Sequence, residues 1–140
     1  SMDIAVTNFS LQGKTIDTIS HPVGSHVVVS RLWRNGIMKV PTGNDPLFLG
    51  DVIHVVGDRD VINRLSLAVG ETSKVDLLEQ PSASMVMRKV VVTRREAIGR
   101  SLGEINPQSR LSVTVTRIMR AGIEFVATPD VRLQLGDSLR

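Results

Sequence analysis

The sequence predicts an α+β fold made of two tandem copies of a small, mainly antiparallel β-sheet module with short helices. The first observation is an internal repeat that aligns without gaps. The second is a series of short runs rich in Val, Ile and Leu, separated by Gly-containing turns, which is typical of strands. The third is a mostly polar stretch between the copies. We therefore expect a first domain at residues 1–70, a linker at 71–84 and a second domain at 85–140.

The repeat has a constant offset of 86 residues. Between residues 3–54 and 89–140, 16 of 52 aligned positions are identical. Unrelated stretches of ordinary composition would share only about three or four. A module of roughly 60 residues buries too small a share of its surface to be stable alone. We therefore expect the copies to pack as a pseudo-twofold pair, the intrachain form of a symmetric dimer.

Each copy opens with a short strand and one helical turn. Ile4–Val6 and Val90–Val92 are apolar runs of strand character. A Gly followed by Thr or Ser precedes the helical turns predicted at Thr15–Ile19 and Ser101–Ile105. The hydroxyl of the Thr or Ser can accept a backbone N–H and cap the turn.

A longer strand follows in each copy, at Val27–Arg34 and Val113–Arg120. Because side chains alternate along a strand, the first copy should carry two distinct faces. One face is predicted to hold Val27, Val29, Arg31 and Trp33, and the other Val28, Ser30, Leu32 and Arg34.

The long strand should turn back as a hairpin. Asn35-Gly36 predicts a two-residue turn, since both central residues of such a turn need positive φ, and Ala121-Gly122 is its weaker counterpart. The returning strands are predicted at Ile37–Val40 and Ile123–Val126.

The first copy is predicted to close with a buried strand and an amphipathic helix. A turn at Gly50-Asp51 leads into the apolar run Val52–Val56, and Asp58 is the expected N-cap. The helical face comprises Val61, Ile62, Leu65, Ala68 and Val69, with Gly70 as the stop. In the second copy the strand that starts after Gly136-Asp137 reaches residue 140, so we expect its closing helix beyond that residue.

Composition excludes several classes of function. The chain has no Cys, and no apolar run approaches the ~18 residues of a membrane span. None of His21, His26 and His54 has metal-ligand spacing, so we predict no metal site. Gly13-Lys14-Thr15 is similar to the end of a P-loop, but the required earlier Gly is Asn8. We find no catalytic constellation and expect no enzyme.

The duplicated arginines are the candidate ligand site. Arg31 and Arg34 correspond to Arg117 and Arg120 under the repeat. Across a pseudo-dyad they could frame an anionic ligand, since guanidinium groups bind phosphate and carboxylate in a bidentate manner. The alternative is that they are edge or surface residues bonded to Asp or Glu.

Charge is distributed unevenly between the copies. Residues 1–84 carry 7 Lys/Arg and 9 Asp/Glu, whereas residues 85–140 carry 10 and 5. The basic second copy raises the alternative of a nucleic-acid-binding protein, but the segment lacks the interleaved aromatic residues typical of such proteins. We therefore expect no nucleic acid as a partner.

Three segments together resemble the RCK C-terminal domain, also called TrkA-C. They are V-T-N-x₄-G-K-T-I-x₂-I from Val6 to Ile19, V-V-V-S-R-L-W-R-N-G from Val27 to Gly36, and P-x₄-P-L-F-L-G-D-V-I-H-V-V-G from Pro41 to Gly57. The second copy matches through V-V-V-T-R and L-x-L-G-D. The tandem pair is most similar to the cytosolic loop of transporters of the aspartate:alanine exchanger family.

The resemblance implies a regulatory domain pair of a membrane transporter, on the cytoplasmic face of the cell membrane. RCK C-terminal modules usually work in pairs, and in potassium-uptake and antiporter systems they bind small ligands such as cyclic di-AMP. The implied partners are the transmembrane part of the parent transporter, a second copy in a homo-oligomer, and a small anionic ligand such as a nucleotide or cyclic dinucleotide, with no resident cofactor. The alternative is an assembly module that dimerises subunits without a ligand.

Overall fold

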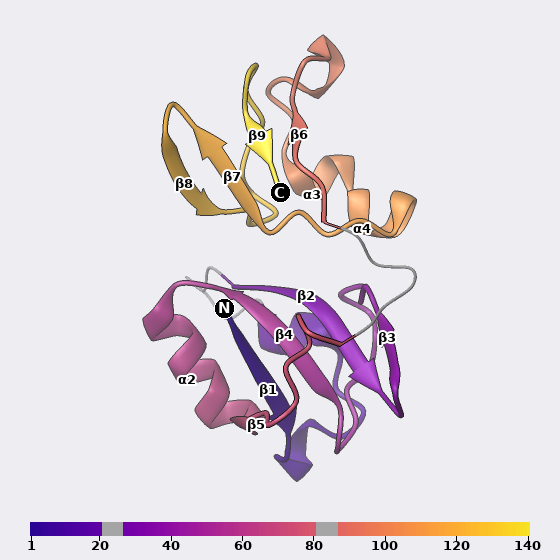
Figure 1. Ribbon diagram of the computed structural model, residues 1–140. Coiled ribbons are helices and arrows are strands. Elements are labelled where there is room, and N and C mark those ends of the chain that lie inside the picture. Colours follow the sequence, from indigo (N-terminus) through magenta and orange to yellow (C-terminus); the bar gives the residue numbers. More distant parts are fainter. Residues whose placement is uncertain (21–26, 81–86) are drawn as a thin grey trace. The chain divides into compact units, whose positions relative to one another are not determined.

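The computed structural model describes residues 1–20, 27–80 and 87–140. The chain divides into two units, Ser1–Met85 and Val86–Arg140. Each unit is an antiparallel sheet with a few short helices, as Figure 1 shows for each of them. The predicted fold class, a mainly antiparallel α+β module present twice, is confirmed.

The first unit contains a five-stranded sheet. Its strands follow the order β3-β2-β4-β1-β5, with antiparallel neighbours throughout. The elements in chain order are β1 Met2–Val6, the 3-10 turn η1 Phe9–Leu11, α1 Ile16–Ser20, β2 Val27–Arg34, β3 Ile37–Lys39, β4 Val52–Gly57, α2 Arg59–Val69 and β5 Gly70–Thr72.

The second unit repeats this plan with four strands in the order β6-β9-β7-β8. Its elements are β6 Val90–Val91, the 3-10 turn η2 Arg95–Ala97, α3 Leu102–Ile105, α4 Pro107–Leu111, β7 Arg117–Arg120, β8 Ile123–Val126 and β9 Ser138–Leu139. No sequence pattern predicted α4 or the 3-10 turns.

The strand register of the two units agrees residue by residue. Ile53 of β4 lies opposite Ile4 of β1 and Leu32 of β2. At an offset of 86, Leu139 of β9 lies opposite Val90 of β6 and Ile118 of β7. Since a one-residue slip would turn every side chain to the other face, this agreement shows that the same backbone is built twice.

The core of the first unit lies between α2 and one face of the sheet. Alternate residues of β4, Ile53 and Val55, face this core and have no solvent exposure. The helix contributes the i, i+3 and i+7 positions Ile62, Leu65 and Val69, as its apolar spacing predicted. Figure 1 shows α2 running alongside this sheet, where it packs against β1, β4 and β5.

A β-bulge changes the predicted faces of β2. The register with β4 shifts between Val29 and Arg31, so that Val27, Val29 and then Leu32 enter the core. One inserted residue reverses the alternation. The predicted grouping of Val27 and Val29 with Arg31 and Trp33 is therefore wrong, as is that of Val28 and Ser30 with Leu32 and Arg34. Beyond the bulge, Leu32 and Arg34 share one face and Arg31 and Trp33 the other.

The long strand predicted at Val113–Arg120 is shorter than expected. Only Arg117–Arg120 forms β7, and Val113 is 47% exposed whereas its counterpart Val27 is 5% exposed. In the first unit Val27–Val29 pair with Val55–Gly57. Within the described residues, no strand pairs with residues 113–115.

Both predicted hairpin turns have the backbone conformation that the sequence requires. Asn35 and Gly36 have φ values of 51° and 77°, and Ala121 and Gly122 have 49° and 79°. Positive φ at both central positions matches the twist of the flanking strands. Ala121 adopts this conformation even though a β-carbon disfavours it.

The predicted caps are present in part. Ser101 Oγ accepts the Glu104 N–H at 3.2 Å, as expected, whereas Thr15 Oγ1 lies 3.1 Å from Thr18 Oγ1. Asp58 occupies the N-cap position of α2, but its side chain makes no capping hydrogen bond.

The expected linker, residues 71–84, begins as part of the first sheet. Residues 70–72 form β5, which pairs with β1, and Ser73 donates its N–H to Asp3 O at 2.8 Å. We call residues 73–78 the strap. Its Leu77 side chain is 1% exposed. The polar composition of the segment did not indicate that it would extend the sheet. The edge of β1 requires a hydrogen-bonding partner for its backbone groups, and polar residues supply such a partner as well as apolar ones do.

Candidate functional site

Arg34 is committed to a buried carboxylate within its own unit. Its Nε and Nη2 donate to Asp51 Oδ1 at 2.8 Å and Oδ2 at 2.6 Å, and Nη2 also donates to Pro46 O at 2.7 Å. The Asp51 side chain is 2% exposed and also accepts the Phe48 N–H. The hydrogen bond to Asp51 raises the pKa of Arg34 above its ordinary value, against the opposing effect of burial. We call this arrangement the Arg–Asp clamp.

The second unit contains the same clamp at an offset of 86. Arg120 donates to both oxygens of Asp137 at 2.8 Å and to Arg132 O at 2.8 Å. The Asp137 side chain is 1% exposed and accepts the Gln134 N–H at 2.9 Å. Hydrogen bonding from Arg120 lowers the pKa of Asp137 below its ordinary value, and hydrogen bonding to Asp137 raises the pKa of Arg120.

The glycine of each L-x-L-G-D element explains why the clamp can form. Gly50 and Gly136 have φ values of 89° and 85°, a conformation that a side chain would strain. Each turn places its Asp carboxylate beneath the preceding loop, where the Asp N–H bonds the carbonyl three residues earlier at 3.1 Å. The clamp thus joins the end of the hairpin strand to the start of the next strand.

An aromatic ring covers each clamp arginine, from a different position in each unit. Arg34 lies over the Phe48 ring at 4.7 Å, and Arg120 over the Phe125 ring at 5.3 Å. Phe48 precedes the turn in the first unit, whereas Phe125 belongs to β8. The contact between arginine and aromatic ring therefore occurs in both units, although the two rings come from positions that do not correspond under the repeat. This favours a stabilising role for the ring.

The structure separates the two predicted site arginines within each unit. Arg31 and Arg34 lie on opposite faces of β2, because they are three positions apart in the part of the strand that follows the bulge. Arg31 makes a long contact of 3.5 Å from Nη1 to Leu77 O, and Arg117 lies 3.6 Å from Glu124. The alternative of arginines bonded to Asp or Glu therefore describes Arg34 and Arg120, while Arg31 and Arg117 are held more weakly.

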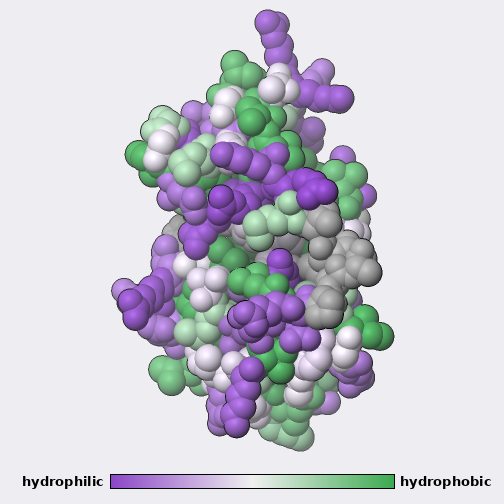
Figure 2. Space-filling view, viewed as in Figure 1, coloured by the Kyte–Doolittle hydropathy of each residue, from purple (hydrophilic) through white to green (hydrophobic). Residues whose placement is uncertain are grey.

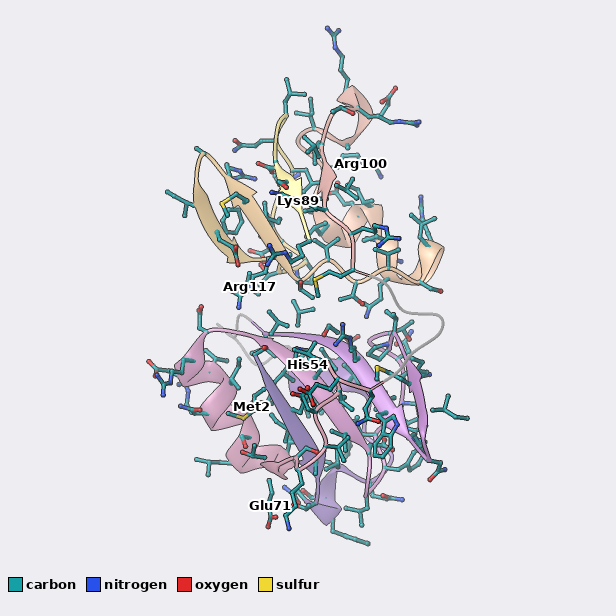
Figure 3. All side chains as sticks on the ribbon, viewed as in Figure 1. Met2, His54, Glu71, Lys89, Arg100 and Arg117 are labelled. Carbon is teal, nitrogen blue, oxygen red and sulfur yellow. The ribbon has the colours of Figure 1, made fainter. Side chains whose placement is uncertain are left out.

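We call the face of the first sheet opposite α2 the strap face. It carries a cluster of polar side chains. Asp3 and His54 lie directly opposite each other on β1 and β4, with His54 Nδ1 2.6 Å from Asp3 Oδ1. Asp3 Oδ2 accepts the Leu77 N–H at 3.0 Å. His54 is only 5% exposed, so this pair is nearly sealed by the strap. Figure 3 shows His54 within the first sheet.

An open pocket of about 340 Å³ lies beside this pair in the first unit. It is lined by Ser1, Met2, Asp3, His54, Thr72, Ser73, Lys74, Val75, Asp76 and Leu78. The lining includes two acidic side chains, one basic side chain and the imidazole, and within the described residues no cluster of His, Asp and Glu could hold a metal ion. It is a candidate for a small polar ligand.

The pairing of Asp3 with His54 was not predicted from the sequence. The available signal was a single polar residue in each of two apolar strands, which needs a buried partner. Strand register, which brings the two together, could not be read from the sequence. His21 and His26 lie outside the described residues.

Comparison with known proteins finds relatives that are named as transport proteins. No family model matches the chain. A Yersinia enterocolitica protein named "Putative transport protein" is 36% identical over 141 residues, covering 99% of this chain and 25% of that protein. A protein of the same name from Yersinia pseudotuberculosis serotype O:3 is 36% identical over 139 residues with the same coverage. The chain is thus homologous to a segment that spans about a quarter of these relatives.

A solved structure entitled "Structure of RCK domain with cda" is similar to part of the chain. It covers 48% of this chain and 93% of its own, at 24% identity and a TM-score of 0.43. Within residues 1–20, 27–80 and 87–140, none of the helices has the length and apolar character that crossing a membrane requires.

Proposed function

We propose that the chain is a tandem pair of RCK C-terminal-like regulatory domains within a membrane transport protein. The observation that carries the proposal is the 36% identity over 99% of the chain to transport proteins four times its length. The duplicated fold supports it, since a repeated module with a rigid clamp in each copy suits a paired regulatory unit. The resemblance of the L-x-L-G-D segments to RCK C-terminal domains supports it as well.

In this proposal the pair lies on the cytoplasmic face of the membrane and has no catalytic activity. It biases the transport cycle by binding differently to two conformations of the transmembrane part. The parent protein is of the aspartate:alanine exchanger type, and it forms a homo-oligomer through these modules. Arg31 and Arg117, whose contacts within each unit are weak, are the proposed residues of a ligand site or pairing face.

The test uses the full-length transporter with clamp variants of either unit. Arg34→Met or Arg120→Met should change the transport rate while the amount of protein in the membrane stays the same. Lys39→Met, which breaks an exposed ion pair with Asp45, is the matched control and should leave transport unchanged. An unchanged transport rate in both Arg34→Met and Arg120→Met, in protein whose clamp is shown to be disrupted, would exclude a regulatory role.

Assembly without a ligand is the second candidate, and the duplicated fold supports it equally. A thermal-shift series with nucleotides, cyclic dinucleotides and amino acids separates the two. A ligand that binds the native state at 100 times its Kd stabilises it by about 2.7 kcal/mol and raises the Tm accordingly. A Tm that no compound raises, together with a concentration-dependent dimer, would establish assembly alone.

A further inference from the structure

The strap-face cluster of the first unit has a counterpart of opposite charge in the second. At an offset of 86, the positions of Asp3, Arg31 and His54 are occupied by Lys89, Arg117 and Arg140. An acid, a base and an imidazole in one unit are thus replaced by three basic side chains. We call these three residues the basic triad.

The strand register brings the triad together. Arg140 and Arg117 form a directly opposed pair, with Arg140 N donating to Arg117 O at 2.9 Å and Arg117 N to Arg140 O at 3.3 Å. Val90 lies opposite Leu139, so Lys89 continues the same register opposite Arg140. Directly opposed residues of antiparallel strands project from the same face. Neighbouring strands are about 5 Å apart, so three long side chains from adjacent strands can reach one ligand.

The side chains of the triad are only partly paired within the second unit. Arg117 Nε lies 3.6 Å from Glu124 Oε1, and among the described residues no hydrogen bond or ion pair engages the side chains of Lys89 and Arg140. Both are exposed, and the Arg117 side chain is 28% exposed. Figure 3 labels Lys89 and Arg117 in this unit, and Figure 2 shows both hydrophilic and hydrophobic residues on the face of the unit that the view presents.

Ser138 adds a hydroxyl group to the same face. It precedes Arg140 by two residues, so the two side chains project on one side of the sheet. Its Oγ is buried and has no hydrogen-bond partner in the described part of the chain. A buried hydroxyl without a partner is uncommon and calls for an explanation.

We propose that the basic triad of the second unit binds the phosphate group of a small molecule or a lipid headgroup. Two guanidinium groups and an ammonium group match the charge of a phosphate better than that of a single carboxylate, and guanidinium groups bind phosphate oxygens in a bidentate manner. The site deepens the proposed regulatory function by naming its ligand chemistry, but its binding test requires no transport, so each can fail without the other.

In the first experiment, inorganic pyrophosphate is titrated into the 140-residue chain at low salt. Binding is measured by calorimetry and by changes in NMR chemical shifts. The chain is amidated at Arg140, so that the carboxylate there does not offset the triad. We expect saturable binding with shifts confined to the triad strands. Lys89→Gln, Arg117→Gln and Arg140→Gln should each weaken it about tenfold, in keeping with the loss of a charge-assisted hydrogen bond. Arg64→Gln, an exposed charge on α2, is the control and should leave the affinity unchanged.

The second experiment transplants the pair of the first unit into the second. Lys89→Asp with Arg140→His recreates the Asp3–His54 arrangement, so the fold has a precedent within the chain. We expect this double variant to abolish pyrophosphate binding while its NMR spectrum remains that of a folded protein. Binding that survives the transplant, or that Arg64→Gln weakens as much as Arg117→Gln does, would overturn the proposal.

Vesicles distinguish the two sources of the phosphate group. The ligand is a lipid headgroup if phosphatidylglycerol vesicles bind the chain, if Arg117→Gln abolishes this binding, and if pyrophosphate competes with the vesicles for the chain. Pyrophosphate binding without vesicle binding indicates a soluble ligand. Phosphatidylcholine vesicles are the neutral control. Saturable binding to neither pyrophosphate nor phosphatidylglycerol at low ionic strength, where screening is weakest, would refute the site.

Discussion

Arg34 holds both oxygens of Asp51, through Nε at 2.8 Å and Nη2 at 2.6 Å, and the Asp51 side chain is almost completely buried. The second unit repeats the arrangement between Arg120 and Asp137. A hydrogen-bonded pair of this geometry fixes the hairpin relative to the L-x-L-G-D turn. Two of the four arginines of the predicted site, Arg34 and Arg120, are therefore bound to a carboxylate of their own unit.

Removing one clamp arginine should destabilise its unit strongly. Arg34→Met leaves the buried Asp51 carboxylate without its partner, which costs about 3 kcal/mol of unfolding free energy for a pair of this kind. Urea unfolding measures the loss. The double variant Arg34→Met with Asp51→Leu should recover much of it, because no charge is then left unpaired. The control Lys39→Met breaks an exposed pair worth less than about 1 kcal/mol, and an equal cost for Lys39→Met and Arg34→Met would contradict the clamp.

The clamp of the second unit should make that unit sensitive to acid. The pKa of Asp137 is lowered in the folded state by its hydrogen bonds from Arg120. The stabilisation is therefore fully present above the ordinary carboxyl pKa and is lost as the pH falls below it, through the lower folded-state pKa. Hydrogen exchange of β7 and β9 amides over a series from about pH 5 to pH 2 measures this loss.

Asp137→Asn tests the assignment of that acid sensitivity. The variant should be less stable at neutral pH, and the pH dependence in the acid range should flatten. Glu96→Gln, an exposed carboxyl on η2, is the control and should keep the wild-type profile. A profile that Asp137→Asn leaves unchanged would show that another carboxyl group is responsible.

The strap should detach when its anchor is removed. Leu77 is 1% exposed, and burial of a leucine of this kind is worth about 3 kcal/mol when it is truncated to alanine. Because the strap has few other contacts, Leu77→Ala should increase exchange at residues 73–78 without affecting α2. Asp3→Asn should have a similar, smaller effect, since it weakens the bond to the Leu77 N–H. Leu78→Ala, at a position 53% exposed, should change little.

Much of the fold follows from the sequence because each copy repeats local signals. Gly50-Asp51 and Asn35-Gly36 require particular backbone conformations, and the structure has them. The helix Arg59–Val69 follows from the spacing of its apolar residues. The register of β6, β7 and β9 then follows from the repeat itself.

The remaining features depend on tertiary contacts that no local pattern shows. The bulge at Ser30 reverses the side-chain alternation of β2. A regular alternation therefore predicted the wrong neighbours from the first half of the strand for Arg31 and Arg34. β5 and the start of the strap join the first unit through the backbone of residues 70–73, which composition cannot reveal. The Asp3–His54 pair depends on register across 51 residues of chain.

The two hairpin turns provide a matched pair of opposite predictions. Ala121 has a φ of 49°, a conformation that costs an alanine roughly 1 kcal/mol, whereas asparagine tolerates it through its short polar side chain. Ala121→Asn should therefore stabilise the second unit, and Asn35→Ala should destabilise the first, each by about 0.5–1 kcal/mol. Urea unfolding, with NMR signals assigned to each unit, measures both effects in one chain. Because the turns share their backbone geometry, the two changes should be nearly equal in size and opposite in sign. Changes of the same sign would show that contacts of the asparagine side chain, and not its backbone preference, determine the stability of these turns.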